Sequence, residues 1–201
     1  GFMDPSDRTG MYTAALYDSD GRPWVAYQNE TYGGSIGTHW MIAKWVGDGS
    51  GNCGEGSLAG KWDCHDLFAS GSPQWFSSSA LSTDIWGRVV VAYYVGVQGH
   101  PLLARNIGAG GICGPYDKWE CFVVAPQTSG HDIGKHVVPY VKDGSLTLFY
   151  QNVTLGVLER AGYVYPESGN CGWSDDSNSY EWQCFTISDM DGIYMDRGIA
   201  V

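Results

Sequence analysis

The sequence predicts an all-β fold, because one pattern of short strands and turns occurs three times in 201 residues. Each copy has a turn glycine before an apolar strand, then a strand that ends in Lys or Arg, and then a closing Trp-x-Cys. The middle copy, residues 87–121, shows the pattern most clearly. The copies recur about every 60 residues, and a period of this size identifies a repeat protein.

Four columns of the repeat hold the same kind of residue in every copy. They are the glycines Gly21, Gly87 and Gly144, the tyrosines Tyr27, Tyr93 and Tyr150, the cations Lys44, Arg105 and Arg160, and the tryptophans Trp62, Trp119 and Trp182. Their recurrence in register indicates structural roles that all three units share.

The first unit follows a polar arm, residues 1–9, and covers residues 10–69. Runs rich in aromatic and β-branched residues, bounded by Gly, Asp and Pro turns, predict its strands. These strands are 10–18, 24–28, 39–46 and 62–68.

The second unit, residues 70–126, and the third unit, residues 127–188, each predict four further strands. They are 78–82, 88–95, 102–107 and 119–124, then 136–141, 145–151, 156–161 and 182–187. The apolar run from Val89 to Tyr94 is too continuous for a half-exposed strand, so we expect it to be covered on both faces.

Residues 189–201 begin with a further Asp-x-Asp-Gly turn and match only the first strand of a fourth unit. Units of four antiparallel strands are typical of the blades of a β-propeller. The predicted fold is therefore β-propeller-like, with three four-stranded antiparallel blades and one extra strand.

The chain resembles secreted β-propeller repeat proteins whose blades follow the pattern G-x-P-x-V-A-Y, L-x-x-A-R and N-C-G…W-x-C. Gly87, Ala92-Tyr93, residues 102–105 and Trp119-x-Cys121 carry the resemblance best, and it spans about residues 10–188. The third unit departs from the pattern at Phe149 and Glu159. The resemblance implies an architecture and no particular activity.

The number of blades leaves three arrangements open, because propellers close with roughly 4–8 blades. These arrangements are a fragment of a longer propeller, half of a two-fold ring, and a filament subunit whose last strand pairs with a neighbour. We expect Ile193, Tyr194, Ile199 and Val201 to form this assembly strand.

The six cysteines predict one disulfide in each unit: Cys53 with Cys64, Cys113 with Cys121, and Cys171 with Cys184. Their spacings are too wide for the Cys-x(2–4)-Cys pairs of zinc sites. Disulfides persist in oxidising compartments, so we expect a secreted protein. The chain opens Gly-Phe-Met, which fits a processed product or part of a longer chain.

The formal charge of −11 excludes the basic footprint of nucleic-acid binding and disfavours anionic membranes. No apolar run approaches the roughly 20 residues that span a bilayer. Motifs for metal-assisted hydrolysis, a nucleophilic serine or phosphate binding do not occur. We therefore expect no enzyme, no metal and no cofactor, and we interpret the acidic turns as ordinary Asx turns.

Two N-glycosylation sequons begin at Asn29 and Asn152, both directly after Tyr-Gln in the same column of the repeat. Each follows a predicted strand, where a turn would be exposed, so we expect at least one to carry a glycan.

The tryptophans outside the repeated column could stack on sugar rings or pack between blades. They are Trp24, Trp40, Trp45, Trp75, Trp86 and Trp173. Two functions follow from the sequence. The first is a non-enzymatic extracellular structural or interaction protein that self-associates in a ring or filament or joins the rest of a longer chain. The alternative is a lectin-type propeller module that binds glycans.

Overall fold

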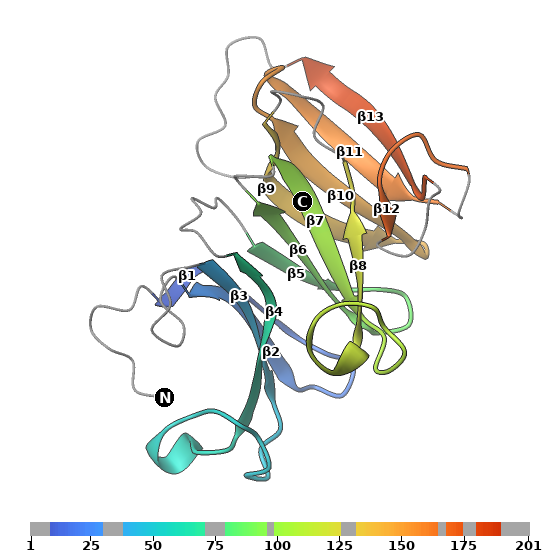
Figure 1. Cartoon of the computed structure of the whole chain (residues 1–201). Coiled ribbons are helices and arrows are strands. Elements are labelled where there is room, and N and C mark those ends of the chain that lie inside the picture. Colours follow the sequence, from blue (N-terminus) through green and yellow to red (C-terminus); the bar gives the residue numbers. More distant parts are fainter. Residues whose placement is uncertain are drawn as a thin grey trace.

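The computed structural model describes residues 9–29, 38–70, 79–95, 99–125, 132–164, 168–174 and 180–189. These residues form thirteen β-strands and two short 3-10 helices, η2 (Gly56–Leu58) and η3 (Pro115–Asp117). The strands build three antiparallel sheets, and each sheet takes its four long strands from one repeat (Figure 1). The predictions of an all-β chain and of four-stranded antiparallel units are confirmed.

The strands follow chain order within each sheet. Sheet 1 has the order β1 (Thr9–Tyr17), β2 (Pro23–Asn29), β3 (Thr38–Trp45) and β4 (Trp62–Ser70). Sheet 2 contains β5 (Ser79–Thr83), β6 (Val89–Val95), β7 (His100–Asn106) and β8 (Trp119–Val123). Sheet 3 contains β9 (Ile133–Lys142), β10 (Ser145–Asn152), β11 (Val157–Tyr163) and β13 (Trp182–Asp189).

One strand was not predicted. The two-residue strand β12 (Trp173–Ser174) leaves the third repeat and pairs with β8, so sheet 2 gains a fifth strand from its neighbour. Its residues come from the disulfide-bridged loop of the third unit.

Sheet 2 lies between sheets 1 and 3, and strand β6 shows this most clearly. Val90 and Ala92 belong to a core cluster shared with sheet 3, whereas Val89, Val91 and Tyr93 belong to a cluster shared with sheet 1. All five side chains are buried. Because successive residues of a strand point to opposite faces, the uninterrupted apolar run is needed to fill two interfaces. The prediction of a strand covered on both faces is confirmed.

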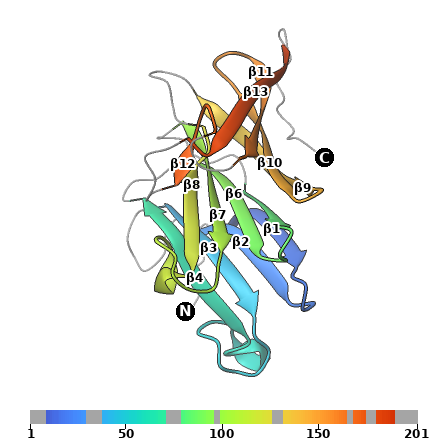
Figure 2. The ribbon, with the colours of Figure 1, turned by 90° about the vertical axis from the view of Figure 1, so that its right-hand side faces the viewer.

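The sheets meet along their first strands, since β1 contacts β5 and β5 contacts β9. From there the sheets spread apart, as two views at right angles show (Figure 2). The two core clusters therefore fill the two spaces between successive sheets.

Each unit contains the predicted disulfide, with Cα atoms 5.9–6.0 Å apart. The backbone N–H of Cys53, Cys113 and Cys171 donates to the carbonyl of the closing tryptophan, at 3.1, 3.2 and 3.0 Å. The three bridges thus fix the same loop closure in all three units.

The predicted assembly strand and the fourth unit lie outside the described residues, as do the arm up to residue 8 and Trp75. Within the described part of the chain, no helix is long and apolar enough to cross a membrane.

Candidate interaction surfaces and an inter-sheet cleft

A cleft opens between sheets 2 and 3 at the end where the strand-connecting turns lie. Its lining includes Trp86 and Arg105 from sheet 2, and Asp143 and Tyr163 from sheet 3. An equivalent cleft between sheets 1 and 2 is lined by residues such as Asp18, Trp24, Lys44 and Arg88. The repeat therefore builds a cleft at the equivalent place twice.

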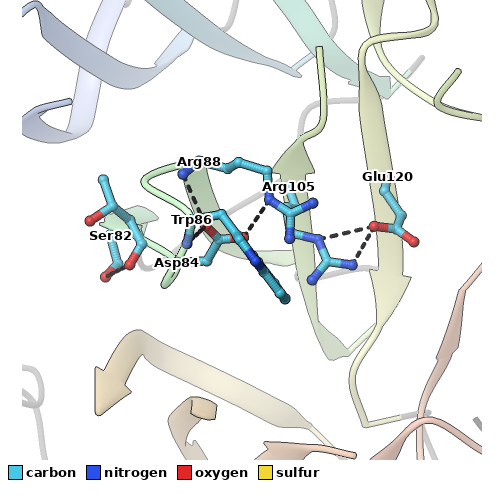
Figure 3. Close-up of polar contacts among 7 residues, drawn as sticks. Ser82, Asp84, Trp86, Arg88, Arg105 and Glu120 are labelled. Carbon is cyan, nitrogen blue, oxygen red and sulfur yellow. Dashed lines mark hydrogen bonds and ion pairs between the residues drawn. The ribbon is translucent and has the colours of Figure 1, made fainter. Parts of the chain in front are cut away.

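Asp84 organises the turn on one side of the first cleft. One carboxylate oxygen accepts from the backbone N–H of Trp86 and of Arg88, both at 2.9 Å, and the other accepts from Nε of Arg88 at 2.6 Å (Figure 3). Asp18 makes the corresponding bonds in sheet 1, including one from the indole N–H of Trp24 at 2.9 Å. Partial burial raises the pKa of Asp18, but the hydrogen bonds to its carboxylate have the larger combined effect, so its pKa is lowered. Both aspartate carboxylates thus accept hydrogen bonds from groups of their own turns.

Arg105 lines the cleft between sheets 2 and 3. Its guanidinium pairs with Glu120, with Nε at 3.0 Å from the carboxylate (Figure 3). The guanidinium also lies over the rings of Phe122 and Tyr163. Burial raises the pKa of Tyr163 although the charge of Arg105 acts in the opposite direction. This arginine is therefore part of the contact between sheets 2 and 3.

Of the predicted tryptophans within the described residues, Trp86 has the most exposed ring. Its side chain is 68% exposed, and the guanidinium of Arg88 lies 4.3 Å from the ring centroid. An exposed indole beside a cation can stack on a flat apolar or anionic group.

The other predicted tryptophans differ in exposure. Trp24 and Trp40 are buried between sheets 1 and 2, where Trp24 packs edge-on against Trp119. Stacking on a sugar requires an exposed ring face, so these two leave the set of glycan-binding candidates. Trp45 and Trp173 are half-buried. Sequence reasoning missed the exposed tyrosines Tyr17, Tyr116 and Tyr180, because a single Tyr at a strand end or between strands carries no signal of its exposure.

Both sequon asparagines are buried. Asn152 is 1% exposed, its side-chain nitrogen donates to Glu159 at 3.0 Å, and its oxygen accepts from the N–H of Leu155. A glycan on that nitrogen would need a path to solvent that a side chain with 1% exposure does not offer, so the folded structure does not favour modification of Asn152. Asn29 is 8% exposed.

The outer face of sheet 3 exposes residues whose equivalents in sheet 2 are buried. Counted from the closing tryptophan, Phe122 and Val124 occupy the same columns as Phe185 and Ile187. The first pair is 1% and 0% exposed and faces sheet 3, whereas the second pair is 46% exposed at both positions. Arg160 lies over Phe185 at 5.0 Å, as Arg105 lies over Phe122 at 5.2 Å. Sheet 3 thus presents an apolar stacking surface that continues the pattern of sheet 2.

The outer face of sheet 1 carries the closing tryptophan that in the other two units packs against the preceding sheet. Trp119 and Trp182 insert toward the preceding sheet and are 2% and 0% exposed. Trp62, in the same column, is only half-buried and packs against Trp45 of its own sheet. The residues of β2 on this face, Val25 and Tyr27, are also half-buried, unlike Val91 and Tyr93 of β6.

Among the described residues, no three His, Cys, Asp or Glu side chains are placed to hold a metal ion. No family model matches the chain, and no curated protein proves significantly similar to it, so the likeness to secreted propeller repeats stays a prediction.

Proposed function

We propose that this chain is a non-enzymatic extracellular interaction protein whose sheets are propeller-like blades and which self-associates by stacking sheet 3 of one copy on sheet 1 of another. One observation carries the proposal: the columns that are buried between successive sheets inside the chain are exposed on the outer face of sheet 3 and only half-buried on the outer face of sheet 1. Exposed apolar patches of this kind mark interaction sites on extracellular and intracellular proteins alike.

The disulfides and the fan of sheets support the other parts of the proposal. Three bridged pairs fit an oxidising compartment. Contacts among the first strands, with the sheets spreading outward, match blades arranged around an axis. A face that stacks on a different face of an identical neighbour is a heterologous contact, which yields a ring or a filament.

Light scattering of the chain after size-exclusion chromatography tests this proposal. We expect the mass of the particle to rise with protein concentration. Phe185→Glu places a charge on the stacking face of sheet 3 and should return the particle to the mass of one chain. Leu155→Glu is the control, since Leu155 is 55% exposed in the β10–β11 turn, outside that face. A wild-type chain that remains monomeric at the highest concentration would refute self-association.

Glycan binding is a second candidate, favoured by the exposed Trp86 beside Arg88 and by the cleft that Trp86 lines. On an array of neutral and acidic oligosaccharides, we expect signals that Trp86→Ala reduces at least tenfold. Tyr17→Ala is the control, because Tyr17 is 72% exposed and is not a lining residue of this cleft. An array without signal, or a signal that Trp86→Ala leaves intact, removes this candidate.

A further inference from the structure

The disulfide-bridged loops of the second and third units each lie against the last strand of the sheet that precedes their own. In the second unit, Tyr116 of η3 packs edge-on against His65 of β4, with ring centroids 5.2 Å apart. In the third unit, Trp173 and Ser174 of β12 pair with Val123 and Phe122 of β8. One loop makes a ring contact and the other a strand pairing, but both dock on the last strand of the preceding sheet. The place of docking is therefore the repeated feature.

The backbone of the third loop comes very close to the preceding sheet. A Cβ atom built on Gly172 would lie 2.2 Å from the carbonyl oxygen of Val124. Only a residue without a side chain permits this approach. The loop therefore docks on the end of β8 by its main chain as well as through β12.

The bridged loop of the first unit, residues 53–64, is anchored in the same way as the loop of the third unit. The side chain of Asn52 bonds to the backbone of Cys64 at 2.7 and 2.8 Å, as Asn170 bonds to Cys184 at 2.7 and 3.2 Å. Its helix η2 has no buried residue, and Leu58 is 48% exposed. Figures 1 and 2 show this loop projecting beyond sheet 1, away from the other two sheets. Sheet 1 is the first of the described sheets, so this folded loop has no preceding sheet to dock on within the described residues.

The matching acceptor is strand β13. It is the outermost strand of sheet 3, and within the described part of the chain no further strand pairs with its outer edge. The equivalent strand β8 is covered by β12, and β4 is contacted by η3. An uncovered strand edge offers backbone donors and acceptors to another chain.

We infer that the loop of residues 53–64 of one copy docks along β13 of a second copy and so sets the register of the stacked sheets. The inference rests on the proposed self-association and specifies its contact. A second copy is the occupant because it carries both halves of the repeated contact: the bridged loop and the half-buried Trp62 on sheet 1, and β13 with Phe185 on sheet 3. Within one chain, Trp182 packs on Phe122 with ring centroids 5.8 Å apart. In the docked pair, Trp62 packs on Phe185 of the neighbour in the same way.

The electrostatic consequence of this contact is specific. Each copy carries a net charge of −11, so two copies repel each other at low ionic strength. Because the contact is apolar and made by main-chain groups, salt screens the repulsion without weakening the attraction. Association should therefore strengthen between about 0.02 and 0.3 M NaCl, whereas an interface held by ion pairs would weaken.

A photo-crosslinking experiment on the whole chain locates the docked loop. The photoreactive amino acid p-benzoylphenylalanine replaces Leu58, and a mixture of isotopically light and heavy chains identifies crosslinks between copies. We expect these crosslinks in the peptide that contains residues 182–189. The same group at Leu155 is the control and should give no crosslink there. Intermolecular crosslinks from position 58 to any other segment would overturn the inference.

A variant separates this inference from the general proposal. Leu58→Asp leaves the fold intact, because the side chain it replaces is exposed, and should weaken association at least tenfold. If the wild type associates and Phe185→Glu abolishes association while Leu58→Asp has no effect, the copies stack without the loop and the inference fails alone. If the wild type does not associate, the proposed function and the inference fail together.

Discussion

Replacing Trp182 by alanine is expected to lower the free energy of unfolding by about 3–5 kcal/mol. Its ring is 0% exposed and packs edge-on against Phe122 at 5.8 Å and Tyr163 at 5.3 Å. The substitution leaves a large cavity in the core cluster between sheets 2 and 3. Urea unfolding, followed by circular dichroism with the disulfides intact, measures the loss.

Trp62→Ala is the matched control for this substitution. Trp62 holds the same place in the repeat but is only half-buried, so its removal from a single chain should cost no more than about 1–2 kcal/mol. Equal losses at the two positions would contradict the assignment of sheet 1 as an open end. Should Trp182→Ala fail to fold, Trp182→Phe keeps part of the ring and allows the same comparison.

Replacing both Cys171 and Cys184 by alanine is expected to destabilise the chain by about 3 kcal/mol. The bridge closes a short loop, and reopening it gives the unfolded chain back part of its conformational freedom. The bridge also sits in the core cluster between sheets 2 and 3, where Cys171 is 8% exposed. Loss of the bridge should release β12 from β8, which hydrogen exchange at Val123, Trp173 and Ser174 would detect.

The bridge between Cys53 and Cys64 provides the comparison. It spans 11 residues against 13 for the third bridge, so the entropic contribution of the two is nearly equal. Because its loop projects from sheet 1, we expect its removal to cost about 1 kcal/mol less, without effect on exchange at Val123, Trp173 and Ser174. A first bridge as costly as the third would show that the packing of the loop adds nothing.

The repeat made the secondary structure predictable. Recurring turns and apolar runs place every long strand within a few residues of its bounds, and one cysteine pair per unit gives the correct disulfides. The unbroken apolar run of β6 even reveals the order of the layers, since only a strand between two sheets needs apolar residues on both faces.

The features that sequence reasoning missed depend on distant neighbours. Strand β12 has two residues, too few for any periodicity to appear. The sequon at Asn152 looks exposed by its position after a strand, yet its threonine and asparagine both serve the fold. The hydroxyl of Thr154 accepts from the backbone N–H of Asp132 at 2.7 Å, and Asn152 bonds to Glu159.

A glycine column also escaped notice, because glycine is frequent throughout the chain. Gly51, Gly111 and Gly169 each pass so close to the carbonyl of the closing tryptophan that a Cβ atom would lie 2.1–2.4 Å from its oxygen. Contacts of this kind are visible only once the bridged loop is folded back on its strand.

The position of sheet 2 between two neighbours bears on how the chain folds. Ala92 and Leu103 are both 0% exposed, and the core residues of this sheet are divided between two interfaces. A middle unit on its own would expose both apolar faces to water, and it could not offset the entropy lost on ordering. We therefore expect the three repeats to fold and unfold cooperatively. Neither end unit can bury the inner face of its sheet without the middle unit.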